Sequence, residues 1–156
     1  MAQFITSAQA GVKVLKTITL IKTNDLHFGT MTIPTAHVMV SLSTSNVRAA
    51  NFPSRVTFLS QSPVASNAAY MVYGSANSTY SINLPSNDVI TNGPGGATAL
   101  ITNFVSKTAS EGVDGNSGTL SEVGIDSFVV GAKLNLNGGQ PFGVYTGTFD
   151  VTVNYH

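Results

Sequence analysis

Apolar residues recur at every second position along most of the chain, and this period constrains the fold more than any other feature. Successive side chains of a β-strand point to opposite faces of its sheet, so the period predicts strands with one apolar and one polar face. The segments with this pattern are residues 3–14, 38–42, 55–60, 68–74, 78–84, 99–107, 127–136 and 143–155. No segment has a convincing helical period, which favours an all-β fold.

Clusters of Pro, Gly, Asn and Asp separate these segments, and such residues interrupt strand pairing or allow positive φ. The clusters are residues 85–88, 92–96, 114–118 and 137–141. No internal repeat or low-complexity linker divides the chain. We therefore expect one antiparallel domain, a β-sandwich or a jelly roll.

Charged residues make up only 9% of the chain, and seven Lys and Arg balance seven Asp and Glu. Nucleic acid is not an expected partner, because a phosphate backbone requires a basic patch. The absence of Cys excludes disulfides and metal sites built on thiolates. No apolar run is long enough to predict a membrane span, and we expect no signal peptide within this chain.

The residues that could perform catalysis lack a suitable setting. None of the three histidines has the neighbours of a general base, since they lie beside apolar residues, at the start of a strand and at the chain end. They are His27, His37 and His156. The carboxylates are scattered, and the nearest pair, Glu111 and Asp114, falls in a loop.

The run Asp-Gly-Asn-Ser-Gly at 114–118 is similar to part of a calcium loop, but Glu122 comes too early to close such a site. A turn is the better interpretation of this run. We expect no enzyme activity, no metal and no cofactor.

The last segment has the sharpest alternation in the chain. Its odd positions predict a core face and its even positions a solvent face. The core-face residues are Gly143, Tyr145, Gly147, Phe149, Val151, Val153 and Tyr155. Residues 127–136 alternate in the same way, and only 137–141 lie between the two segments, so we expect them to pair as a hairpin.

With Tyr at the penultimate position and Gly fourteenth from the end, this segment resembles the final strand of bacterial chaperone-usher pilus subunits. In that family the final strand borders a groove where the sandwich lacks one strand, and the N-terminal extension of the next subunit fills the groove. The resemblance implies a filament subunit with identical subunits, a periplasmic chaperone and an outer-membrane usher as partners.

Residues 3–14 have the form that such a donor strand needs. The eleven residues 4–14 would span about 36 Å at strand rise. The side chains expected to enter successive pockets are Phe4, Thr6, Ala8, Ala10, Val12 and Val14. We therefore expect residues 1–16 to be an extension and residues 17–156 to be a single sandwich domain.

A wider resemblance covers most of the chain and is carried by residues 18–31, 68–85 and 127–155. These segments are similar to a family of bacterial secreted domains of unknown function. The resemblance implies an Ig-like, pilin-like antiparallel sandwich, incomplete until a donor strand joins it, and a location at the bacterial cell surface.

Three other interpretations remain open at this point. Residues 3–14 could be an ordinary first strand that pairs within its own sandwich. The protein could be a monomeric secreted sandwich that binds glycan or protein through its loops, although it has no Trp to offer a sugar. It could also be a viral capsid or tail jelly roll.

Overall fold

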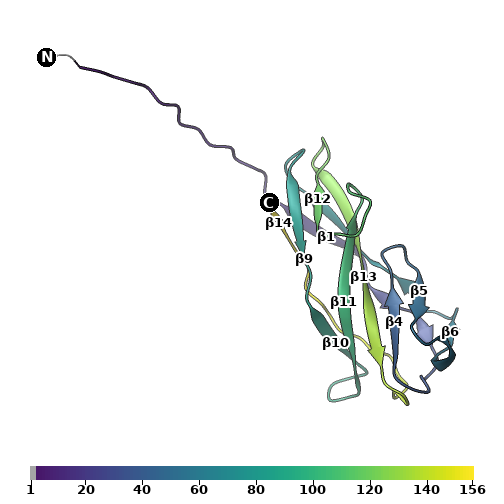
Figure 1. Cartoon of the computed structure of the whole chain (residues 1–156). Helices are drawn as coiled ribbons and strands as arrows, with labels where there is room; N and C mark the ends of the chain where they lie inside the picture. The colour runs from purple at the N-terminus through teal and green to yellow at the C-terminus, as the bar shows by residue number, and fades with distance from the viewer. Residues whose placement is uncertain (1–2) are drawn as a thin grey trace.

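The computed structural model describes residues 3–156, and within them the fold is all-β and antiparallel (Figure 1). One large sheet has the order β1-β8-β13-β11-β10, and β4 pairs with both β13 and β5. Its strands are β1 (Thr19–Asn24), β4 (Val38–Leu42), β5 (Arg48–Ala50), β8 (Ala68–Tyr73), β10 (Asn87–Thr91), β11 (Thr98–Thr108) and β13 (Ile125–Leu136). The all-β antiparallel prediction is therefore confirmed.

A smaller sheet of order β12-β9-β14 forms the facing layer of the sandwich. Two short ladders, β2-β7 and β3-β6, lie beyond the end of β1. The strands are β2 (His27–Phe28), β3 (Thr30–Met31), β6 (Phe58–Leu59), β7 (Ala65–Ser66), β9 (Thr79–Asn83), β12 (Ser117–Thr119) and β14 (Thr152–Tyr155), with one 3-10 turn at Pro53–Arg55.

The core follows the alternation of the sequence. In β13 every second side chain is buried, and these residues are Phe128, Val130, Ala132, Leu134 and Leu136. Phe128 and Val130 belong to an apolar cluster between β8 and β9. Ala132, Leu134 and Leu136 belong to a second cluster, which includes residues of β4 and the beginning of β11. Burial of this kind is the main favourable term for folding.

The prediction that residues 127–136 and 143–155 pair as a hairpin is wrong. β13 pairs with β8, β11 and β4, whereas β14 pairs with β9 in the other layer. Alternation identifies the face that a strand buries but not its partner, and these two segments bury their apolar faces from opposite sides of one core. The expected strand over 143–155 is also shorter than predicted, because regular pairing begins only at Thr152.

Residues 3–17 do not form a strand within their own sandwich, which was one of the interpretations that the sequence left open. They are extended, exposed and without backbone partners in a ladder, and they lead away from the body beside the C-terminus (Figure 1). The first strand begins at Thr19. Within residues 3–156 we find no helix long and apolar enough to cross a membrane.

Candidate functional site

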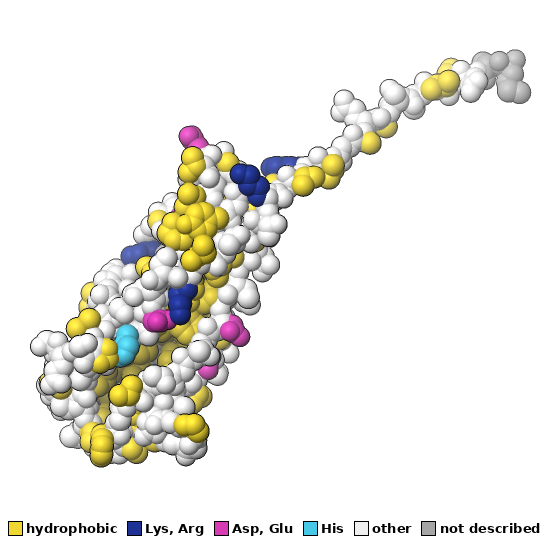
Figure 2. Space-filling model, turned by 180° about the vertical axis from the view of Figure 1, so that it is seen from behind, with side chains coloured by type: hydrophobic (Ala, Val, Ile, Leu, Met, Phe, Trp, Pro, Cys, Tyr) yellow, Lys and Arg dark blue, Asp and Glu magenta, His cyan; other side chains and the backbone are white. Residues whose placement is uncertain are grey.

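A groove with a volume of about 700 Å³ opens between the first strands and the last segment of the chain. Figure 2 shows a furrow along the body with hydrophobic side chains on its floor and charged side chains at its rims. One wall is formed by residues 22–34 and the other by residues 140–149, with 88–90 behind it. The floor is formed by core residues, including Tyr70, Ile101 and Leu134.

Both walls of the groove have a free backbone edge. Among the described residues β1, β2 and β3 each pair with a single strand, which leaves their groove side without a ladder. On the other wall, Thr146 exchanges two 2.9 Å hydrogen bonds with Thr91 of β10 and the neighbouring residues form no regular strand. An apolar floor between two free edges has the geometry of a sandwich that lacks one strand.

Arg48 holds one wall in place from behind. Its guanidinium donates hydrogen bonds to the carbonyls of Phe28 (2.9 Å), Thr30 (3.2 Å) and Leu59 (3.3 Å). The same group lies 4.2 Å from the centre of the Phe58 ring, and burial lowers its pKa. Gly29, at φ +82°, sits against Arg48, and any side chain there would overlap the guanidinium. Arg48 thus connects β2, β3 and β6.

Replacing Arg48 by Met should destabilise the protein by about 1–3 kcal/mol, because three carbonyls lose a charged donor while the packing volume is kept. The urea midpoint of the monomeric protein measures this change. Lys107→Met is the matched control, since Lys107 makes only a 3.3 Å bond to Ser45 Oγ, and it should change the midpoint little. Equal effects of the two substitutions would contradict the role of Arg48.

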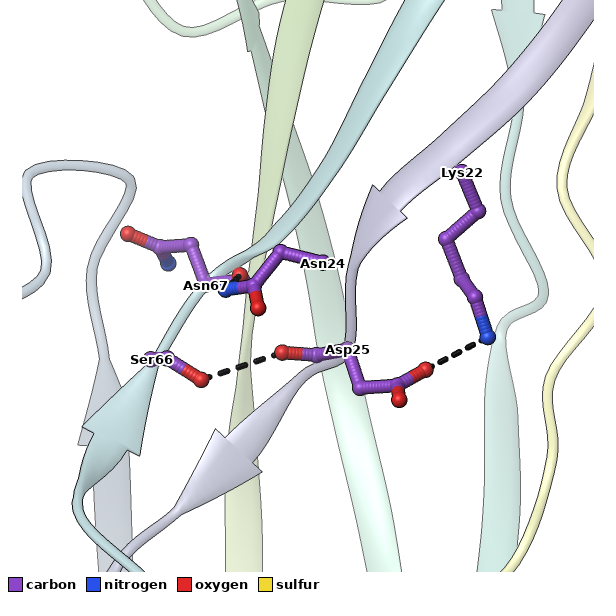
Figure 3. Close-up of polar contacts among 5 residues, drawn as sticks. All are labelled: Lys22, Asn24, Asp25, Ser66 and Asn67. Carbon is purple, nitrogen blue, oxygen red and sulfur yellow. Dashed lines mark hydrogen bonds and ion pairs between the residues drawn. The ribbon is translucent and has the colours of Figure 1, made fainter.

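An ion pair lies at the upper end of the groove. Lys22 Nζ is 2.6 Å from Asp25 Oδ1, and both side chains belong to the groove wall (Figure 3). Beyond this pair the two walls close, because Ile18 and Leu20 pack in the same apolar cluster as Val151 and Val153. The groove therefore runs from the Lys22–Asp25 pair to the opposite end of the sandwich.

Tyr155 fixes the point at which the N-terminal segment leaves the body. Its hydroxyl donates a 2.7 Å hydrogen bond to the carbonyl of Lys16 and accepts a 2.8 Å bond from the N–H of Ser75. Ser75 Oγ in turn accepts a 2.6 Å bond from the N–H of Lys16. Gly74 allows this contact, since a Cβ there would overlap the Tyr155 hydroxyl.

The predicted acceptor residues divide into two groups. Gly143, Tyr145, Gly147 and Phe149 line the groove, whereas Val151, Val153 and Tyr155 pack above its closed end. The apolar members of the set are half-buried and the even positions are exposed. Val144, Thr146 and Thr148 of the even positions also line the groove.

The predicted donor residues lie outside the groove of their own chain. Phe4 is 96% exposed, Val12 86% and Val14 83%. Thr6, Ala8 and Ala10 are exposed as well. The structure therefore does not bring the donor and acceptor residues of one chain together.

Sequence reasoning missed the wall over residues 22–34 and the residues that shape it. One signal was available for Lys22, because it shares parity with Ile18 and Leu20 and so interrupts an apolar face. Nothing in the sequence marks Arg48. Of the three histidines, His27 lies in the groove wall, and within residues 3–156 no three His, Asp or Glu side chains form a group that could hold a metal.

One of the comparisons with known proteins gave a match. The family model described as Domain of unknown function (DUF4402) matches residues 18–155. Neither the curated proteins nor the solved structures contain a significant match. The matched range covers both walls of the groove and leaves the exposed N-terminal segment outside it.

Proposed function

We propose that this chain, which belongs to the DUF4402 family, is a structural subunit of a bacterial surface filament, a pilus or fimbria, that polymerises by donor-strand exchange. In this proposal residues 3–14 of one copy enter the groove of another, on the cell surface and after handling by a periplasmic chaperone and an outer-membrane usher. The observation that carries the proposal is the groove, an apolar floor between two free strand edges in a chain whose own N-terminal segment is unpaired.

The groove and the segment are complementary in chemistry. An added strand would give main-chain partners to both free edges, and its alternate side chains would meet the apolar floor. Each large apolar side chain buried in this way contributes about 1.5–3 kcal/mol, and Ala contributes less. Such a pairing also removes the aggregation risk that an open edge presents.

The positions of the two partners favour exchange between copies. Tyr155 and Ser75 hold Lys16 at the closed end of the groove, and the segment leaves from there away from the body (Figure 1). The open end, near Ile33 and Phe142, lies at the far end of the sandwich. A second copy stacked below would send its segment up through this open end, parallel to β1.

Deleting residues 1–14 tests the proposal. The intact protein should form filaments under the electron microscope and denaturant-resistant ladders on a gel of unboiled sample. The shortened protein should form neither, because it keeps the groove and lacks the strand that fills it.

A synthetic peptide of residues 1–16 provides the control for this deletion. Its binding to the shortened protein should raise the thermal midpoint by mass action, which would also establish that the groove is intact. Ladders that persist after the deletion would contradict donor-strand exchange.

A further inference from the structure

We propose that the donor segment of a second copy occupies the groove in one register, with Thr6 on the Lys22–Asp25 pair and Val14 beside Ile33. This inference rests on the proposed donor-strand exchange and adds the element that fixes the position of the strand along the groove. The occupant is residues 6–14 of another copy of this chain.

Lys22 faces the core side of its sheet, where an apolar residue is expected. It is the ladder partner of Tyr70, which is only 7% exposed, and partners in an antiparallel ladder point to the same face. Burial and the negative charge of Asp25 both raise the pKa of Tyr70, which agrees with a carboxylate beside the groove floor. The Lys22–Asp25 pair therefore places charge beside the apolar floor at one end of the groove.

The backbone of Asp25 is held by its neighbours. Its carbonyl accepts a 3.1 Å hydrogen bond from Ser66 Oγ (Figure 3). The preceding Asn24 donates a 2.9 Å bond to the carbonyl of Asn67, and Asn67 donates a 2.8 Å bond to the carbonyl of Ser43. The ion pair thus occupies a fixed position in the groove wall and serves as a reference point for an incoming strand.

This pair is open to solvent, since the side chains of Lys22 and Asp25 are 56% and 78% exposed. A strand laid over the pair would exclude solvent from it, and a charge covered by an apolar side chain is costly. The ion pair engages Oδ1 of Asp25, and Oδ2 has no hydrogen-bond partner among the described residues. A hydroxyl above the pair would supply a donor in place of water.

Thr6 is the one polar residue among the six predicted to point inward, and the lengths agree with its placement at Asp25. The wall from Asp25 to Ile33 and the segment from Thr6 to Val14 are each nine residues long. With Thr6 at Asp25, a strand parallel to β1 ends with Val14 at Ile33. A slip of two residues, which preserves the inward face, would instead place Phe4 or Ala8 over the charges.

Cysteine cross-linking of the full chain tests this register without interference, because the protein has no Cys of its own. The variant Val14→Cys with Ile33→Cys should give a covalent ladder on a boiled, non-reducing gel. The variant Val12→Cys with Ile33→Cys reports the slipped register and should give at least tenfold less cross-linked product. The single-cysteine variants are controls that should give no covalent ladder.

The outcomes separate the register from the proposed function. Equal or stronger cross-linking of the Val12 variant, or unboiled ladders without any cross-link, would overturn the register and leave donor-strand exchange standing. The absence of ladders in every form of the protein would overturn both.

A second pair of variants tests the role of the hydroxyl in the cross-linking assay. Thr6→Val keeps the shape of the side chain and removes the hydrogen-bond donor. It should therefore lower several-fold the ratio of Val14 to Val12 cross-linked product, while ladders of unboiled sample persist. Thr6→Ser keeps the hydroxyl and should preserve the preference. The same preference in both variants would contradict the contact between Thr6 and the ion pair.

Discussion

Replacing Ala8 by Asp should abolish polymerisation. Ala8 lies in the middle of the segment proposed to enter the groove, and its side chain would face the apolar floor. Covering an unpaired carboxylate there costs several kcal/mol, and each ~1.4 kcal/mol lowers an equilibrium constant tenfold. The expected result is at least a hundredfold loss of ladders on gels of unboiled sample and of filaments under the electron microscope.

Gln9→Asp is the matched control, since it adds the same charge at the neighbouring position, whose side chain would point to solvent in the filled groove. It should leave the ladders nearly unchanged. Both variants should keep the thermal midpoint of the monomer, because residues 3–14 are exposed and contribute little to its stability. Loss of ladders in both variants would contradict an alternating contact.

Replacing Gly131 by Ala should cause the largest loss of stability among the substitutions considered. Gly131 is buried in β13, where a Cβ would overlap the carbonyl oxygen of Leu42 and lie 3.0 Å from the carbonyl carbon of Ser43. Since these are backbone atoms at the end of the neighbouring strand β4, no change of side-chain rotamer relieves the overlap. The expected loss is about 3 kcal/mol or more, at or above the upper range of overpacked sites.

Gly115→Ala provides the comparison, because a Cβ at Gly115 meets no atom within 4 Å. Urea denaturation of both variants in the Ala8→Asp background measures the difference without the contribution of assembly. We expect Gly115→Ala to change the midpoint little. A Gly131→Ala protein as stable as its parent would show that β4 and β13 can separate at no cost.

Period-two alternation predicted five of the longer strands, but it could not predict their partners. The segments now seen as β4, β8, β9, β11 and β13 agree with the prediction within two residues at each end. β10 was missed because residues 85–88 have turn composition, although Asn87 begins the strand. Pairing depends on contacts that are distant in sequence, and the wrong hairpin followed from using chain proximity alone.

The candidate site was predictable on one side only. The alternation of 143–155 identified the wall that contains Tyr145 and Phe149. The opposite wall depends on the hydrogen bonds of the Arg48 guanidinium and on the ion pair of Lys22, whose roles come from tertiary position. Residues 3–14 showed the alternation of a strand, yet their own chain provides no ladder for them.

The contact between Tyr155 and Lys16 has a consequence for the shape of any assembly. The N-terminal segment is fixed at one end of the sandwich, and the groove opens at the other. A polymer joined through these two parts would have unlike ends, with an empty groove at one and a free segment at the other. Growth at the two ends would then be chemically different, and a chain carrying only one of the parts would act as a terminator at a single end.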